Sequence, residues 1–215
     1  MKIYSYIVAK DYGLAPNPYW GELTLNVCKP KIRQSAVVGD WVIGTGAKNV
    51  KNKNGVIKDY SGRMVYAMRV TKKMTMEEYD SYCKENLSRK IPFVDRENWK
   101  RIIGDSIYDY SQSGIPKLRK VLHKEEDKKR DLSGKYTLLS TDFYYFGNAT
   151  VEIPEKFKVL IKNEQGHKVN EDAELNQKFT HWLVNNFESN KLYGEPQLQW
   201  QLIKGVEGEF NIKCD

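Results

Sequence analysis

Alternating apolar and polar side chains mark several strands in the first half of the chain. Residues 2–9 (KIYSYIVA) and 22–28 (ELTLNVC) alternate in this way, and residues 63–70 (RMVYAMRV) show the clearest pattern. Residues 41–46 (WVIGTG) form a short apolar run after a Gly-Asp turn at 39–40. Because side chains along a strand point alternately to opposite faces, these patterns predict four β-strands.

Three segments carry helical signals. Thr75, followed three residues later by Glu78, forms a capping-box pattern that predicts a helix reaching Leu87. Residues 171–188 place their apolar side chains on one helical face. Residues 31–36 predict one helical turn or a short helix before the Gly-Asp turn.

The other segments predict loops and further strands. Residues 47–62 are rich in Lys, Asn and Gly and predict a mobile, hairpin-like loop. Residues 125–130 (EEDKKR) are mixed in charge and predict a solvated turn. Residues 136–140 (YTLLS) and the aromatic run at 143–147 predict two more strands. Neither a repeat nor a low-complexity linker divides the chain.

These elements predict an α+β fold in which helices pack outside a strongly curved, antiparallel or mixed sheet. The turn at 39–40, the strands on either side of residues 47–62 and the capped helix follow the order of the PUA-like fold, which the chain resembles. The resemblance implies a PUA-like β-barrel with peripheral helices and a C-terminal helical extension. We expect residues 1–170 to form this domain, and residues 171–215 to pack on it as a helix and tail.

A longer set of short segments extends the resemblance. The segments, as they stand here, are Asp11, Gly13, APNP at 15–18, YWG at 19–21, TL at 24–25, CKP at 28–30, IR at 32–33, GDW at 39–41, GTG at 44–46, MVYAM at 64–68, GDSIY at 104–108, DLSGKY at 131–136 and DFYYFGNA at 142–149. On these residues the chain resembles the nucleotide modification associated domain, type two. The resemblance implies a context of modified nucleotides and phage conflict, and it supplies no established catalytic residues.

Composition and charge narrow the function classes. The 215 residues carry a formal net charge of +7, and a basic surface attracts polyanions. No apolar run long enough to cross a membrane is present, so we expect a cytoplasmic protein without a membrane partner. The cysteines and histidines lack metal-ligand spacings, so no metal or cofactor is expected.

Aromatic residues near the N-terminus suggest a site for a base. Tyr19 and Trp20 follow a Pro-rich loop that contains Asn17, and Trp41 opens the strand at 41–46. Together they predict a stacking pocket, since every base offers a face to an aromatic ring. Packing in the core is the alternative for Trp41.

A second group of candidates lies further along the chain. Tyr144, Tyr145 and Phe146 are consecutive, so alternation predicts one exposed ring at a pocket or an interface. The alternative is that the outer ring packs beneath the C-terminal helix. Lys29 and Arg33 are four residues apart, so a helical turn would align them as a phosphate clamp. A solvated basic helix end is the alternative for this pair.

Acid–base chemistry has weaker support in the sequence. Asp11, Glu22, Asp105 and His123 lie in or near the matching segments, but nothing in the sequence fixes the distances between them. Surface or capping roles are the alternative for each. The GxG at residues 44–46 precedes no helix, which excludes a Rossmann dinucleotide site.

Three functions remain open. The leading one is a binding module that recognises a modified base or nucleotide, in DNA, in RNA or free, through an aromatic pocket with a basic rim. This interpretation requires Trp20 and Arg33 to face the same cleft. The runner-up is an enzyme that hydrolyses or transfers a group on a modified nucleoside, with Lys29, Thr24 and Glu22 offering the residue types of ASCH-like amide hydrolysis. The third is a protein–protein adaptor that docks through the helix containing Trp182.

Overall fold

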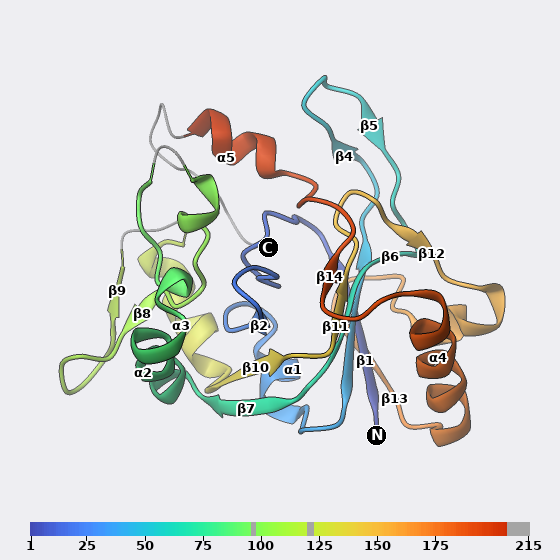
Figure 1. Cartoon of the computed structure of the whole chain (residues 1–215), viewed down its shortest axis with the longest axis horizontal. Helices are drawn as coiled ribbons and strands as arrows, with labels where there is room; N and C mark the ends of the chain where they lie inside the picture. Colours follow the sequence, from blue (N-terminus) through green and yellow to red (C-terminus); the bar gives the residue numbers. More distant parts are fainter. Residues whose placement is uncertain (96–97, 120–122, 206–215) are drawn as a thin grey trace.

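A mixed sheet runs through the middle of the computed structural model, which describes residues 1–95, 98–119 and 123–205 (Figure 1). Its strands, in spatial order, are β13 (His167–Asn170), β1 (Ile3–Val8), β3 (Trp41–Gly46), β6 (Arg63–Arg69), β11 (Phe143–Tyr145) and β14 (Lys191–Leu192), with β12 (Val151–Glu152) also on β6. β1 and β3 are parallel, as are β11 and β14, and the other pairs are antiparallel. The N-terminal strand therefore lies inside the sheet and has neighbours on both edges.

A smaller sheet continues from the large one. It contains β2 (Leu23–Leu25), β10 (Tyr136–Ser140) and β7 (Lys72–Thr75). Two residues separate β6 from β7 and β10 from β11, so an antiparallel ribbon passes from one sheet into the other. The described strands form no closed barrel, so the chain is shown as an α+β fold with a mixed sheet.

The sequence predictions for the strands are largely confirmed. β1, β3 and β6 lie where alternation placed them, and residues 47–62 form a hairpin of β4 (Val50–Lys51) and β5 (Ile57–Lys58). The segment at 22–28 gives only the three residues of β2, because Asn26 turns its side chain to the carbonyl of Asp105. A further hairpin pairs β8 (Tyr108–Asp109) with β9 (Lys117–Leu118).

The predicted helices also form. α2 (Met76–Asn86) begins with the capping box: the hydroxyl of Thr75 accepts from the amide of Glu78 at 3.1 Å, and the Glu78 carboxylate accepts from the amide of Thr75 at 2.7 Å. Further helices are α1 (Pro30–Ser35), α4 (Ala173–Asn186) and α5 (Gln199–Gly205). There are also 3-10 turns: η1 (Ser88–Lys90), η2 (Trp99–Arg101) and η3 (Glu155–Leu160). Among the described residues, no helix is long and apolar enough to span a membrane.

The charged segment at 125–130 is a helix and not the predicted turn. It opens α3 (Glu125–Ser133), whose first turn is acidic and whose last turn carries Arg130. This order of charges suits the helix dipole. Asp131 is the buried residue of this helix, and it lies just after the charged segment 125–130 on which the prediction was based.

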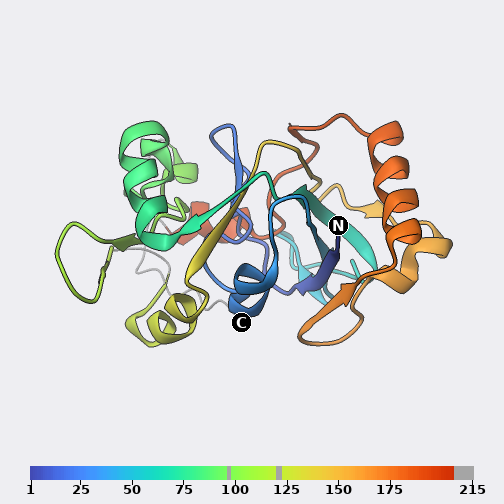
Figure 2. The ribbon, with the colours of Figure 1, turned by 90° about the horizontal axis from the view of Figure 1, so that it is seen from below.

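Both faces of the large sheet are covered, which explains the aromatic run in β11. Tyr144, Tyr145 and Phe146 are all buried, so no ring is exposed and the alternative of packing beneath the C-terminal helix is confirmed. Alternation does hold: Tyr145 lies in the core facing the smaller sheet, whereas Tyr144 and Phe146 lie in the core beneath α4. Figure 2 shows α4 on the side of the large sheet opposite to α2 and α3.

Candidate functional site

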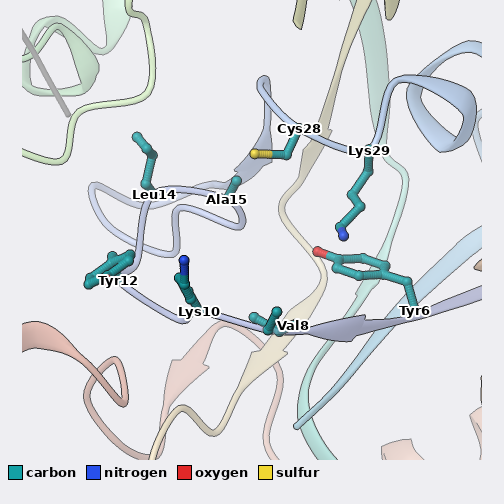
Figure 3. A pocket seen from close by; sticks show the side chains of 9 residues that line it. Tyr6, Val8, Lys10, Tyr12, Leu14, Ala15, Cys28 and Lys29 are labelled. Carbon is teal, nitrogen blue, oxygen red and sulfur yellow. The ribbon is translucent and has the colours of Figure 1, made fainter. Parts of the chain in front are cut away.

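Three hollows adjoin one another between the end of β1 and the start of α1, and on towards residues 45–48 and 162–165. The tyrosine cavity, about 20 Å³, is lined by Tyr6, Val8, Ala9, Lys10, Tyr12, Leu14, Ala15, Cys28 and Lys29 (Figure 3). The basic groove, about 300 Å³, is lined by residues 28–32, Arg130 and residues 165–167. The loop groove, about 470 Å³, is lined by Ile7, residues 45–48, residues 61–62 and residues 162–165.

These hollows adjoin one another through shared lining residues, and together they are called the path. Cys28 and Lys29 line both the tyrosine cavity and the basic groove. Gln165 lines both the basic groove and the loop groove. The two grooves have the size of ordinary small-ligand sites, whereas the cavity has room only for a group of a few atoms.

The lining of the path is basic. Its charged residues are Lys10, Lys29, Lys31, Lys48, Lys162 and Arg130, with Glu164 as the acidic one. Burial lowers the pKa of His167, and the charges of Lys31 and Lys29 lower it further. Lys29 and Lys31 thus give the basic groove a positive potential, which attracts anions.

The tyrosine cavity is built from the end of β1 and the turn before α1. The ammonium of Lys29 lies over the ring of Tyr6, 4.7 Å from its centroid. The hydroxyl of Tyr66 donates to the hydroxyl of Tyr6 at 2.9 Å, and this bond helps to fix the position of the Tyr6 ring. Figure 3 shows the ends of Lys10 and Lys29 directed into the space between the two chain segments.

The turn that carries Cys28 and Lys29 is held from both sides. Both residues have left-handed backbone conformations, with φ of 57° and 41°. The amide of Cys28 donates to Oδ1 of Asp131 at 2.9 Å, and its carbonyl accepts from Nε of Arg33 at 2.7 Å. Left-handed conformations are costly for side chains with a Cβ, so these two contacts stabilise a strained turn.

Cys28 is also the first of three linked groups. Nδ1 of His123 lies 2.7 Å from Oδ2 of Asp131, and both side chains are fully buried. The thiol of Cys28 is hydrogen-bonded to His123. Burial lowers the pKa of His123, but the bond to Asp131, the bond to Cys28 and the Asp131 charge outweigh it and raise the pKa to about 10. A thiol, an imidazole and a carboxylate therefore lie in series beside the cavity.

Arg33 does not line the path. It is fully buried, and its guanidinium donates to the carbonyl oxygens of Cys28, Tyr136 and Asp131 at 2.7, 2.8 and 2.5 Å. Its role is to close the turn before α1 against α3 and β10. Of the two residues of the predicted phosphate clamp, only Lys29 lines the path. Arg33 is buried, so it does not face a cleft together with Trp20.

The aromatic loop lies elsewhere. Asn17 is buried, where its Oδ1 accepts from the ammonium of Lys90 at 2.8 Å and its Nδ2 donates to the carbonyl of Ile103 at 2.7 Å. Tyr19 is buried and donates to Glu195 at 2.9 Å. Trp20 is half-buried, and the guanidinium of Arg89 lies 5.3 Å from its ring centroid. The three hollows have none of Asn17, Tyr19 and Trp20 in their lining.

The remaining aromatic candidates belong to the core. Trp41 stacks on Tyr144, with ring centroids 6.4 Å apart and an interplanar angle of 21°. Tyr145 donates its hydroxyl to the carboxylate of Asp11, 2.8 Å from each oxygen. Burial raises the pKa of Asp11 to about 6, against the effect of its hydrogen bonds.

The residues considered for amide hydrolysis are separated. The hydroxyl of Thr24 donates to Asp105 at 2.6 Å and accepts from Lys90 at 2.8 Å, while Glu22 accepts from the hydroxyl of Tyr82 at 2.8 Å. Thr24 therefore pairs with the buried Lys90 and not with Lys29. Within the described parts of the chain, no group of three His, Cys, Asp or Glu residues is arranged to hold a metal ion.

A comparison with protein families gives a match over nearly the whole chain. The model of the nucleotide modification associated domain 2 family matches residues 1–204. The match runs past residue 170 and so includes α4 and β14. No curated protein and no solved structure matches the chain significantly.

Proposed function

Because the chain belongs to the nucleotide modification associated domain 2 family, we propose that it binds a modified nucleotide, free or within a nucleic acid, along the path of the three hollows. The observation that carries the proposal is that the basic groove and the tyrosine cavity adjoin each other at Cys28 and Lys29. A basic surface beside a small cavity suits a phosphate next to a modified base.

Each part of the path would meet a different part of the ligand. Phosphate oxygens would lie in the basic groove, where Lys29 and Lys31 act as point charges and Arg130 offers a planar fork. The tyrosine cavity would take the modifying substituent, because its volume of about 20 Å³ is too small for a whole base. Arg130 thus takes the role that the sequence had suggested for Arg33.

Three finer features are part of the proposal. The ribbon that passes between the two sheets supports an open variant of the PUA-like barrel. The family match supports a role in a nucleotide-modification context, which we propose to be cytoplasmic and connected with phage conflict. Trp20, half-buried beside Arg89, would stack on a neighbouring base in a longer nucleic acid.

The test is the salt dependence of binding. We would titrate labelled mononucleotides and short oligonucleotides, modified and unmodified, into the full chain at several salt concentrations and follow fluorescence anisotropy. Each phosphate contact contributes about 0.9 to the slope of log K against log salt on duplex DNA, so Lys31→Glu should reduce both the affinity and the slope. Lys178→Glu, on the exposed face of α4, is the matched control and should leave both unchanged. Equal, salt-independent affinity for all ligands would reject the proposal.

The other two functions have unequal support. The helix of the adaptor hypothesis packs Trp182 against Phe157, Phe179 and Phe187, so this half-buried ring serves the core as well as the surface. Catalysis is favoured by a specific observation, the thiol, imidazole and carboxylate beside the cavity.

A further inference from the structure

Cys28 lies where the tyrosine cavity meets the basic groove, and it is the one cysteine among the described residues that lines either of them. Figure 3 shows its sulfur directed towards Ala15, into the cavity. Its thiol is hydrogen-bonded to His123, which in turn contacts Asp131 at 2.7 Å. Nucleophile, base and orienting carboxylate are thus in the order that activated nucleophiles require.

We propose that Cys28 is a catalytic nucleophile, activated by His123 and oriented through Asp131, that removes a small acyl group bound as an amide or ester on the nucleotide. This inference rests on the proposed function, since the basic groove must hold the phosphate while the cavity takes the acyl group.

The charges around the sulfur favour its reactive form. The imidazolium of His123 is adjacent, and the guanidinium of Arg33 donates to the carbonyl of Cys28 itself. Positive charge beside a cysteine stabilises the thiolate, which is the nucleophile. Asp131 holds the ring of His123 through Oδ2 and the amide of Cys28 through Oδ1, so a single carboxylate positions both partners.

The reaction is balanced with water as the second substrate. Before the attack the proton of the thiol is already on His123, as a thiolate–imidazolium pair, and the thiolate forms a C–S bond with the carbonyl carbon of the acyl group. The tetrahedral intermediate expels the nucleotide's amine or alcohol, which takes a proton from His123. Water, losing a proton to His123, then cleaves the thioester, releases the acyl group as a carboxylic acid and restores the thiolate–imidazolium pair.

The cavity also provides for the developing oxyanion. The side-chain ends of Lys10 and Lys29 are directed into the cavity that Cys28 also lines (Figure 3). Positive groups fixed before the reaction stabilise an oxyanion effectively in a site that excludes water. The space of about 20 Å³ limits the acyl group to a small one, such as formyl or acetyl.

The first experiment measures thiol reactivity in the full chain. Iodoacetamide alkylation of Cys28 would be followed by peptide mass spectrometry between pH 6 and pH 9. We expect a rate that changes little with pH. An ordinary thiol has a pKa of about 8.5, and below that pH its rate would rise roughly tenfold for each unit by which the pH is raised. Cys83 is the internal control, because burial raises its pKa to about 12 and it should stay unmodified. Cys28 reacting as slowly as Cys83, or with an ordinary thiol profile, would overturn the inference.

The second experiment separates catalysis from binding. Nucleoside 5′-monophosphates acetylated on the base or on the sugar would be offered to the wild type and to Cys28→Ser, which keeps the size of the side chain. We expect both proteins to bind, and only the wild type to release acetate and to carry an acetyl group on the Cys28 peptide. Binding by both without release or acetylation would overturn the inference and leave the proposed function standing. Absence of binding by both would reject the proposed function and, with it, the inference.

Discussion

The guanidinium of Arg33 occupies the space that a side chain at Gly134 would need. A Cβ on Gly134 would lie 2.3 Å from Cζ and 2.3 Å from Nη2 of Arg33. Arg33 cannot move aside freely, because three carbonyl oxygens hold it. The glycine of the segment DLSGKY is therefore explained by a contact with α1, about a hundred residues earlier in the chain.

Gly134→Ala should destabilise the protein through this contact. Gly134 has a φ of −71°, which alanine adopts without strain, so the effect is steric and should cost about 1–3 kcal/mol. Urea denaturation would measure it, with the exposed Ser133→Ala as the control. An alanine variant as stable as the wild type would show that Arg33 has another place to go.

Lys90 should be important for stability. Its buried ammonium donates to both oxygens of Asn17, to the carbonyl of Glu22 and to the hydroxyl of Thr24 at 2.8–3.0 Å. Lys90→Met leaves these acceptors and the nearby Asp105 without a cation, which should cost about 3–5 kcal/mol.

The control for Lys90 is its exposed neighbour. Arg89→Met removes a cation over Trp20 and should cost no more than about 1 kcal/mol. Equal unfolding free energies for the Lys90 variant and the wild type would contradict the role given to this ammonium.

His123 should make the stability depend on pH. The pKa of His123 in the folded chain, about 10, lies above its ordinary 6.5. Its contribution is therefore complete below about pH 6.5 and is lost as the pH rises through 10. Burial lowers the pKa of Lys90 to about 8. Because deprotonation of Lys90 removes the cost of burying its charge, stability rises as the pH rises above about 8, and this gain masks part of the loss that comes from His123.

Comparison with His123→Gln removes that complication, because Lys90 is common to both proteins. The stability difference between wild type and variant should shrink by on the order of 2–4 kcal/mol from pH 6.5 to pH 10. Denaturation curves across this range would measure it. A difference that stays constant would mean that His123 is not held as an imidazolium.

Trp41 should matter for stability and not for binding. Its stack on Tyr144 lies in the core beneath α4, so Trp41→Ala should cost about 3–5 kcal/mol. The milder Trp41→Phe should fold and bind the nucleotide ligand with wild-type affinity. A loss of affinity in that variant, with stability retained, would return Trp41 to the ligand site.

Local patterns in the sequence were enough to place most of the elements. Alternation located β1, β3 and β6, and the capping box located α2, since these signals depend on neighbours within a few residues. The burial of Tyr144 could not be predicted in the same way, because it depends on α4 covering the second face of the sheet.

The candidate site was less predictable for the same reason. Arg33 is an ordinary basic residue in sequence, and only the tertiary fold brings three carbonyl oxygens to it. His123 and Asp131 approach Cys28 from about a hundred residues away. The available signal was that Cys28 and Asp131 each begin a matching segment, CKP and DLSGKY.

The interior position of β1 has a consequence for synthesis of the protein on the ribosome. β1 can pair with β3 as soon as residues 41–46 are available, but its other edge is covered by β13, residues 167–170. Until that part of the chain is made, the nascent sheet has an open edge, and open edges invite pairing with other chains. Newly made chains should therefore need protection from aggregation until β13 has left the ribosome and paired with β1.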